Sequence, residues 1–266
     1  MMVLILLMYY MTSSVELTPG IMGNGMGGMT VLMDEGIPVF HNPAINHQKI
    51  FNFILGKWFY GINNFTFGVT YQKNALALYY LNYGEIQGYD EYGTATGRFA
   101  PYDLNIGYAR RVGAWGFCLK NFQTRIDTVF YTGIVGGIGL YSNFSRCAFG
   151  LKVDNIGAEL IHYAAVPLIF GIGIRYALFE EADIFFEIKG KDLEIGAGFL
   201  YQYGYLKLLS GIRYIKPQDY LKQDFLKDCL LTGGVMVSVN EYEIGYVLIM
   251  SSFSSAHQLG IKLTPE

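Results

Sequence analysis

A glycine-rich stretch near the N-terminus has a spacing that could hold a phosphate group. Gly23, Gly25 and Gly28 match the pattern GxGxxG, in which the missing side chains let the backbone approach the pyrophosphate of a dinucleotide. That chemistry needs a strand before the glycines and a helix after them, within a βαβ unit. Here Pro19 and an apolar leader precede the glycines, and the pattern after them predicts no parallel sheet. We therefore expect no nucleotide cofactor.

Side chains for acid–base, nucleophilic or metal chemistry are not grouped in the sequence. It contains neither HExxH nor GxSxG, the motifs of common zinc proteases and serine hydrolases. His41 and His47 leave open a metal site near the N-terminus, but we expect no metal and no enzymatic activity. The four histidines are scattered along the chain: His41, His47, His162 and His257.

Charge and cysteine content narrow the function classes further. The net charge is -3 at pH 7 and no run of lysine and arginine occurs, so binding to the phosphates of a nucleic acid has no electrostatic basis. Cys118, Cys147 and Cys229 show no CxxC spacing, which excludes the usual zinc and redox motifs. We expect no nucleic-acid partner.

Alternating strands are the elements that must position the remaining side chains. Between Pro167 and Leu178 every second residue is large and apolar, and the residues between them are mostly small or polar. A period of two indicates an extended strand whose side chains point alternately into two environments. The pattern recurs in segments of about ten residues, the length with which a tilted strand crosses the hydrocarbon core of a bilayer. Such repetition is typical of a transmembrane β-barrel.

Composition supports the same fold class. Hydrophobic residues make up 52% of the chain, yet they form no long uncharged run outside the N-terminal leader, which argues against transmembrane helices. Charged residues are only 15%, whereas about a quarter is usual in soluble domains. We predict an all-β transmembrane antiparallel β-barrel of about 14 strands, with a soluble β-protein as the alternative. The predicted strands are Ile50–Lys57, Asn63–Gln72, Ala75–Gly84, Tyr102–Arg111, Ala114–Thr124, Val129–Tyr141, Arg146–Asn155, Pro167–Leu178, Ala182–Lys189, Leu193–Tyr201, Tyr205–Ile215, Leu231–Val239, Glu241–Met250 and His257–Leu263.

The predicted connections alternate in length. Every second connection is tight, as at Val112-Gly113 and Glu180-Glu181, and the long ones fall among the others, at Glu85–Pro101, Ile156–Val166 and Lys216–Cys229. Outer-membrane barrels have short periplasmic turns and longer external loops. The pattern therefore favours a barrel in contact with the lipid of a bacterial outer membrane.

The period of two also assigns side chains to the lumen. On Pro167–Leu178 the apolar face that contains Ile172 should contact lipid, and the opposite face should point inward. Polar residues at the alternate positions that point into the lumen are the candidates for contact with a solute. These lumen-facing candidates are Asp103, Asn105, Lys152, Asp154, Arg175, Asp183, Glu187 and Glu243.

Short sequence blocks lie in a recognisable order around the first strands. Gly25-Met26-Gly27-Gly28 is followed by Asp34-Glu35 and by Asn42-Pro43-Ala44, and the block Tyr83–Asp90 ends the third strand. This order resembles FadL-like outer-membrane proteins, most closely the PorV/PorQ branch. Each block alone is weakly specific, but together they are more specific, and the resemblance extends from Gly25 to about Leu263.

The resemblance implies that an N-terminal segment folds into the lumen as a plug. Residues 1–14 resemble the apolar part of a signal peptide, with a buried N-terminal strand as the alternative. The predicted organisation is a signal peptide at 1–14, a plug at 15–48 and a barrel at 49–266. A plug without any ligand role is the other possibility for the second segment. The plug-motif residues are Gly25, Gly27, Gly28, Asp34, Glu35, Asn42, Pro43 and Ala44.

The resemblance also implies three candidate functions. FadL-like proteins carry small hydrophobic molecules, so the first expectation is transport of a fatty acid or an aromatic compound across the outer membrane. Proteins of the PorV/PorQ branch take part in type IX secretion and surface attachment, so a barrel that binds secretion-system proteins is the alternative. A structural or general-diffusion barrel is the third.

Overall fold

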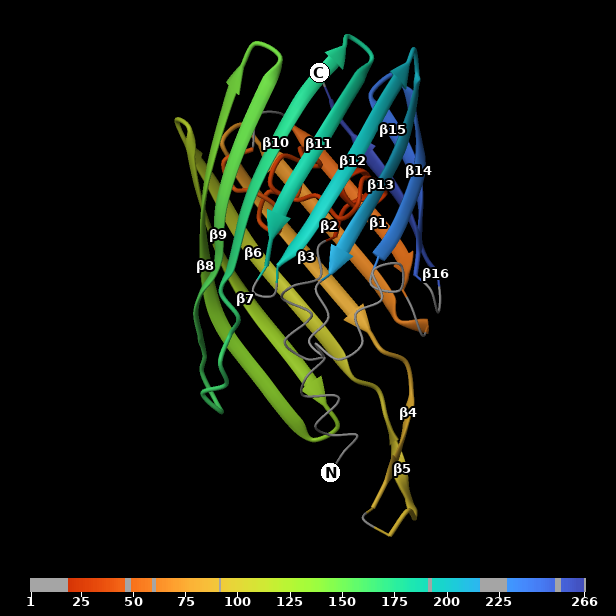
Figure 1. The fold of residues 1–266 in the computed structure, drawn as a ribbon. Helices are drawn as coiled ribbons and strands as arrows, with labels where there is room; N and C mark the ends of the chain where they lie inside the picture. Colours follow the sequence, from red (N-terminus) through yellow and green to blue (C-terminus); the bar gives the residue numbers. More distant parts are fainter. Residues whose placement is uncertain are drawn as a thin grey trace.

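The structure of the protein is a computed structural model that describes residues 19–45, 49–58, 61–90, 92–190, 193–215, 229–251 and 255–265. These residues form a closed antiparallel barrel of fourteen strands and one separate hairpin (Figure 1). The predicted fold class is therefore confirmed. The strands are β1 (Ile50–Lys57), β2 (Asn63–Tyr71), β3 (Asn74–Asn82), β4 (Ile86–Tyr89), β5 (Ala95–Phe99), β6 (Tyr102–Val112), β7 (Trp115–Ile126), β8 (Val129–Phe144), β9 (Cys147–Glu159), β10 (Ile169–Phe179), β11 (Ala182–Lys189), β12 (Glu194–Tyr203), β13 (Leu206–Ile215), β14 (Cys229–Val239), β15 (Tyr242–Met250) and β16 (Ser255–Leu263).

Pairing follows the order of the chain around the barrel. Each barrel strand pairs with the next one, and β3 pairs with β6 because β4 and β5 pair only with each other. The ring closes where β1 pairs with β16, from Phe51 opposite Leu263 to Lys57 opposite His257. Closure leaves each described barrel strand paired on both sides, which a bilayer requires because it offers no water to unpaired backbone groups.

The strand bounds depart from the predicted ones most clearly at β9. The alternation predicts an end at Asn155, but the strand continues to Glu159. Its register with β8 shifts between Gly136 and Ile138, and Asn155 has a φ of 63°. This β-bulge reverses which residues face inward, so the period-two pattern stops before the strand does.

Turns of two residues join the barrel strands at one end, as at Gly113-Ala114 between β6 and β7. At the other end the connections are mostly longer, and the connection Asp127-Thr128 is the short exception among the described ones. The segment predicted as the loop Glu85–Pro101 contains the hairpin β4–β5, which projects beyond the barrel (Figure 1). Most of the predicted loop Lys216–Cys229 lies outside the described residues.

The outer face of the barrel carries large apolar side chains. On β10, Phe170, Ile172 and Ile174 are each about half exposed, while Gly171 and Gly173 between them are buried. An apolar surface that surrounds the whole molecule is stable only against lipid. The described residues contain no helix that is long and apolar enough to cross a membrane.

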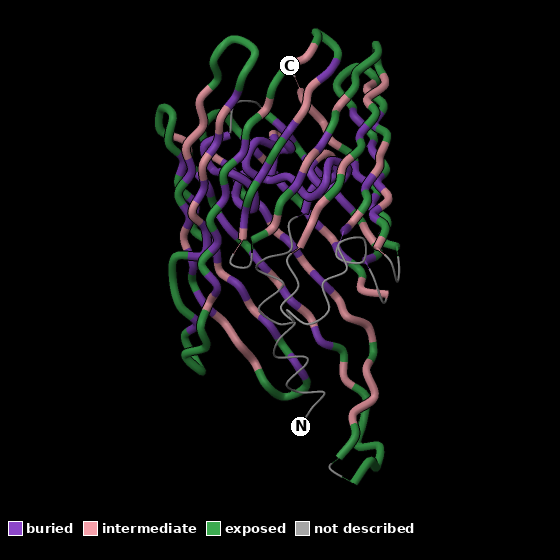
Figure 2. The backbone as a smooth tube through the Cα atoms, viewed as in Figure 1, coloured by how far each residue is buried: buried purple, intermediate pink, exposed green. Residues whose placement is uncertain are grey.

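The lumen contains the N-terminal segment Pro19–Ile45, called the plug segment below. It includes a short helix, α2 (Ile21–Gly25), and lies inside the barrel toward the end with the short turns (Figure 2). Every residue of the segment is buried except Met22 and Asp34, which are half-buried. Its apolar side chains and the inner wall form the hydrophobic core.

Candidate functional site in the barrel lumen

The plug segment lies directly against glycines of the inner wall. A Cβ atom on Gly116 would lie 2.1 Å from the carbonyl carbon of Pro43, and one on Gly139 would lie 1.9 Å from Oδ1 of Asn42. Because no side chain fits in these gaps, the wall glycines form a seat that allows the plug backbone to approach closely. Other wall glycines in contact with the plug segment are Gly68, Gly107, Gly150, Gly171, Gly173, Gly196, Gly198, Gly211, Gly245 and Gly260.

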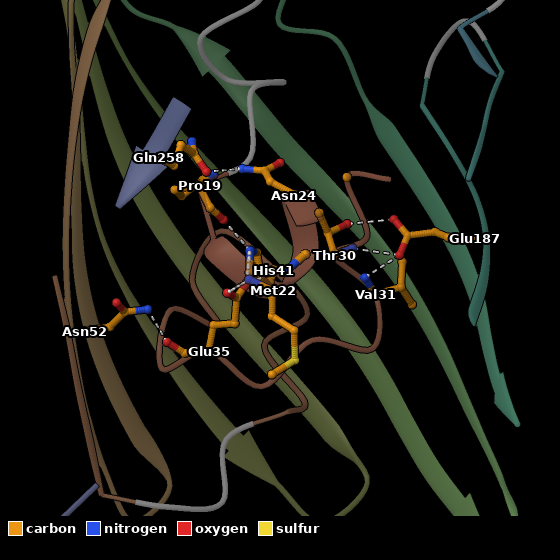
Figure 3. Close-up of polar contacts among 12 residues, drawn as sticks. Pro19, Met22, Asn24, Thr30, Val31, Glu35, His41, Asn52, Glu187 and Gln258 are labelled. Atoms are coloured by element: carbon orange, nitrogen blue, oxygen red, sulfur yellow. Dashed lines mark hydrogen bonds and ion pairs between the residues drawn. The ribbon is translucent and has the colours of Figure 1, made fainter. Parts of the chain in front are cut away.

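Glu187 on β11 is the strongest polar anchor of the plug segment. Its carboxylate accepts hydrogen bonds from the backbone nitrogen of Thr30 at 2.7 Å, the hydroxyl of Thr30 at 2.9 Å and the backbone nitrogen of Val31 at 2.8 Å (Figure 3). Nearby, Nζ of Lys189 donates to the carbonyl oxygen of Gly28 at 2.7 Å. Buried hydrogen bonds to charged groups are among the strongest in proteins, so this part of the plug is firmly held.

Asn42 fixes the plug segment to β8 and β9. Its Nδ2 atom lies 3.0 Å from the carbonyl oxygen of Leu140 and 3.2 Å from that of Leu151, and 3.0 Å from that of Val31 within the plug. Its Oδ1 atom accepts a hydrogen bond from the nitrogen of Ala44 at 3.0 Å. The tripeptide Asn42-Pro43-Ala44 thus forms a turn that rests on the wall.

The glycines of the plug motif lie against β13 and β14. Gly27 and Gly28 have φ values of 84° and 76°, a left-handed conformation that glycine adopts without strain. The hydroxyl of Thr232 accepts a hydrogen bond from the nitrogen of Gly27 and donates one to the carbonyl oxygen of Gly25, both at 2.9 Å. One wall side chain therefore binds two glycines of the predicted block, Gly25 and Gly27.

Glu35 and His41 pair inside the plug segment. The carboxylate of Glu35 accepts hydrogen bonds from the nitrogens of Met22 and Gly23, at 2.5 Å and 3.2 Å, and lies 3.9 Å from Nε2 of His41. Burial raises the pKa of Glu35 to about 7, although these backbone groups and Lys262 oppose the shift. Burial also lowers the pKa of His41 to about 3. Both groups are therefore stabilised in their neutral forms.

Charged residues of the inner wall are paired with one another. Nζ of Lys120 lies 2.6 Å from Oδ1 of Asp154. Arg213 binds Glu194, and Lys207 binds Glu243. These pairs are buried or nearly so. In each pair, the attraction between the two charges compensates the cost of removing them from water.

The predicted lumen residues differ in their contacts and in their burial. Glu187 contacts the plug segment, and Asp154 and Glu243 form ion pairs within the wall. Asp103 accepts hydrogen bonds from the hydroxyls of Tyr83 and Thr124. Asn105 and Lys152 are buried, and Arg175 and Asp183 are half-buried.

The predicted plug-motif residues lie together in the plug segment, and Asp34 is the half-buried member of the set. Sequence reasoning did not single out several wall residues that contact the plug. Thr232 is one, Asn52 is another, because its Nδ2 donates to the carbonyl oxygen of Glu35 at 2.5 Å, and Gln258 is a third, because its Oε1 accepts from Asn24 at 2.9 Å. All three occupy inward-pointing positions of their strands, β14, β1 and β16, and this alternation is the signal that could have identified them.

No group of three or more His, Cys, Asp and Glu residues converges as a metal site among the residues that the structure describes. His47, one of the two histidines considered for a metal, lies outside them. Small cavities remain between plug and wall. One of about 10 Å³, room for about one water molecule, is lined by Gly28, Met29, Lys189 and Arg213 among others.

Comparisons with known proteins give matches in structure and none in sequence. No family profile matches the chain, and neither does any curated protein. The toluene transporter TodX of Pseudomonas putida superposes with a TM-score of 0.63 and 12% identity, over 92% of this chain and 96% of TodX. The toluene transporter TbuX of Ralstonia pickettii gives 0.62 and 12%, over 94% and 99%. A FadL homologue of Pseudomonas aeruginosa gives 0.58 and 9%, over 93% and 98%.

Identities of 9% to 12% establish a shared fold and nothing finer. The solved structures support the FadL-like part of the predicted resemblance, and none of those named here is a PorV or PorQ protein. The branch within the fold therefore stays a proposal. The chain has a FadL-like transmembrane β-barrel fold, with a plug segment held in its lumen.

Proposed function

We propose that the protein carries small hydrophobic molecules, such as aromatic compounds or fatty acids, across a bacterial outer membrane. The observation that carries this proposal is the obstructed lumen, in which the buried plug segment lies toward the end with the short turns and binds the wall through Glu187 and Asn42. A solute can pass only if the plug segment moves. The solved structures with the same fold include proteins described as toluene transporters.

The chemistry of the inner wall supports a hydrophobic solute. Toward the end with the longer connections, the wall carries large buried apolar side chains, and such linings suit apolar ligands. Polar anchors such as Glu187 lie where the plug segment is seated. The apolar residues are Trp58, Leu81, Phe122, Ile126 and Ile249.

A reversible disulfide lock tests whether transport needs plug movement. A Cβ atom on Gly173 would lie 3.2 Å from Cβ of Val31, close to the separation of about 3.5–4.5 Å in a disulfide. The pair Val31→Cys and Gly173→Cys is made in a Cys147→Ser background, because Cys147 is exposed while Cys118 and Cys229 are buried. We expect the oxidised lock to stop uptake of labelled toluene or oleate by cells without other transporters of this fold.

Reduction of the lock should restore uptake, and the two single-cysteine variants should transport in both redox states. These controls separate the lock from damage caused by either substitution. If the disulfide is verified and the oxidised and the reduced double variant take up the solute equally well, plug-gated transport is contradicted.

A second candidate function follows from the hairpin β4–β5. Its strands pair only with each other, and the side chains of Tyr89 and Tyr92 are 66% and 85% exposed. Isolated hairpins are marginally stable in water, so a partner protein would stabilise this one. A PorV/PorQ-like role in secretion predicts that deletion of residues 86–99 abolishes capture of secretion-system proteins from native membranes and leaves solute uptake intact.

The organisation of the N-terminus is part of the same proposal. Residues 1–14, which lie outside the described part of the chain, would act as a signal peptide that directs the protein to the outer membrane. N-terminal sequencing of the protein from membranes tests this directly. A mature protein that still begins at Met1 would contradict it.

A further inference from the structure

One continuous area of the inner wall carries buried polar side chains that lack hydrogen-bond partners. Within the described part of the chain, no partner exists for either amide atom of Asn64, the hydroxyls of Thr66 and Tyr79, Nδ2 of Asn105 or Nε2 of Gln258. All are deeply buried, with exposed fractions of 3% for Asn64, 0% for Thr66 and 1% for Tyr79. We call these five residues the polar patch.

The strand register places the members of the polar patch side by side. Thr66 on β2 lies opposite Tyr79 on β3, which lies opposite Asn105 on β6. Asn64 follows on the same face of β2, two residues from Thr66. Directly paired residues on one face of a sheet have Cβ atoms about 5 Å apart, so one small molecule can reach several of these groups.

Gly56 on β1 joins the two sides of the patch. It lies opposite both Asn64 and Gln258. A Cβ atom on Gly56 would lie 2.1 Å from Oδ1 of Asn64 and 2.9 Å from Cγ of Gln258, so both side chains extend over this glycine. The amide of Gln258 binds Asn24 of the plug segment only through Oε1, which leaves its Nε2 atom available.

Such a cluster is costly unless something binds it. A buried polar group without a partner destabilises a protein by about 1–3 kcal/mol, and native structures contain few such groups. The plug segment contributes apolar cover, since the ring of Phe40 packs edge-on against Tyr79 with centroids 5.9 Å apart. The patch contains hydroxyls and amides and no formal charge, so the chemistry that it fits is uncharged and rich in oxygen.

We infer that the polar patch binds the hydroxyl or carbonyl group of an uncharged amphipathic molecule in the lumen. The amide and hydroxyl groups of Asn64, Thr66 and Tyr79 donate to the oxygen of this molecule, and its apolar part packs against the apolar wall. This inference rests on the proposed function in taking the lumen as the path of the solute. It adds that the preferred solute is an alcohol or phenol and not a plain hydrocarbon.

The matched probes p-cresol and toluene test the inference, because they differ by one hydroxyl. A purely apolar lumen would favour toluene, since burying an unpaired hydroxyl is unfavourable. We expect the full chain in detergent micelles to bind p-cresol about tenfold more tightly than toluene, the effect of one good hydrogen bond, by isothermal titration calorimetry. The anion p-toluate should bind no more tightly than p-cresol, because the patch holds no cation.

Near-isosteric variants assign the preference to the patch. Thr66→Val and Tyr79→Phe should each reduce the preference for p-cresol severalfold and leave the ligand-free protein as stable as the wild type or more so. Thr70→Val is the matched control on the same strand, because the hydroxyl of Thr70 already accepts from the nitrogen of Ile50 at 3.0 Å. This control should lose stability and keep the preference.

Several outcomes would overturn the inference: toluene binding at least as tightly as p-cresol, p-toluate binding most tightly, or a preference that survives both patch variants. The result is separable from the proposed function. If the disulfide lock blocks toluene uptake and the protein shows no preference for p-cresol, only the polar site is contradicted. A preference for p-cresol in a protein whose uptake ignores the lock would contradict only plug-gated transport.

Discussion

The carboxylate of Glu187 holds Thr30 by two hydrogen bonds, one to its backbone nitrogen and one to its hydroxyl. A residue in the middle of the wall is thereby connected to one 157 positions earlier in the chain. The bonds are buried and one partner is ionic, a combination that makes them strong and sensitive to substitution. The contact between Glu187 and Thr30 therefore offers a direct way to weaken the plug without changing its own sequence.

Replacing Glu187 by Gln should loosen the plug segment. The nitrogens of Thr30 and Val31 both bind Oε2 of Glu187, so the amide oxygen of Gln can keep both bonds. Without the charge of the carboxylate these bonds weaken, at a cost of about 1 kcal/mol. We expect faster hydrogen exchange at these two amides, measured by mass spectrometry. The control Glu181→Gln, in an exposed turn, should leave their exchange unchanged. Identical protection in both variants would rule out the anchor role of Glu187.

Adding a methyl group to the glycine seat should displace the plug segment. In Gly116→Ala the new Cβ would meet backbone atoms of Pro43 and Ala44 at 2.1–2.2 Å, and overpacking of this kind costs about 1–3 kcal/mol. The thermal unfolding midpoint should fall. Gly97→Ala is the control, because nothing lies within 4 Å of a Cβ at that position. Equal midpoints for the two variants would mean that the wall glycines do not seat the plug.

A charge on the outer face should destabilise the barrel according to its depth in the bilayer. Ile172 is 49% exposed in the middle of β10, so Ile172→Arg should cost about 2–4 kcal/mol in lipid. Tyr205→Arg, in a short turn at the end of the barrel, should cost at most about 1 kcal/mol. Urea unfolding from lipid vesicles measures both. A harmless arginine at Ile172 would show that this face does not contact the hydrocarbon core.

The pKa of Glu35 predicts how stability depends on pH. Burial raises it from 4.5 to about 7, so the neutral carboxyl contributes stability that is fully present below pH 4.5 and is lost as the pH rises through about 7. Between pH 4.5 and 8 the wild type should lose about 3 kcal/mol relative to Glu35→Gln. The midpoints of urea unfolding of both proteins, measured across this pH range, test the prediction. Parallel curves for the two proteins would contradict the prediction.

The strands were predictable from the sequence because each alternates between lipid and lumen. On β10 the exposed Phe170, Ile172 and Ile174 follow directly from a period of two. The pattern failed where geometry broke the period, at the bulge near Asn155. The hairpin β4–β5 was missed for a different reason, since both of its faces are solvated and its residues show no apolar alternation.

The contacts between plug and wall were less predictable, because they join residues far apart in the sequence. A resemblance between short blocks pointed to Asn42 and to the glycines near Gly27. It did not indicate that Thr232 would bind these glycines or that Gln258 would bind Asn24. The wall glycines were visible as inward positions on their strands. Their role as a seat depends on which strand faces which part of the plug, and that information exists only in the closed barrel.

The seam between β1 and β16 imposes an order of events on biogenesis. The ring cannot close before β16 reaches β1, so the outer edges of these two strands stay unpaired while the strands between them assemble. The plug segment precedes all the barrel strands in the sequence and lies inside the finished barrel. The open ring is therefore its direct route into the lumen, because after closure only the two mouths of the barrel would admit it. A variant that delays docking of the plug segment should consequently accumulate as a closed but empty barrel.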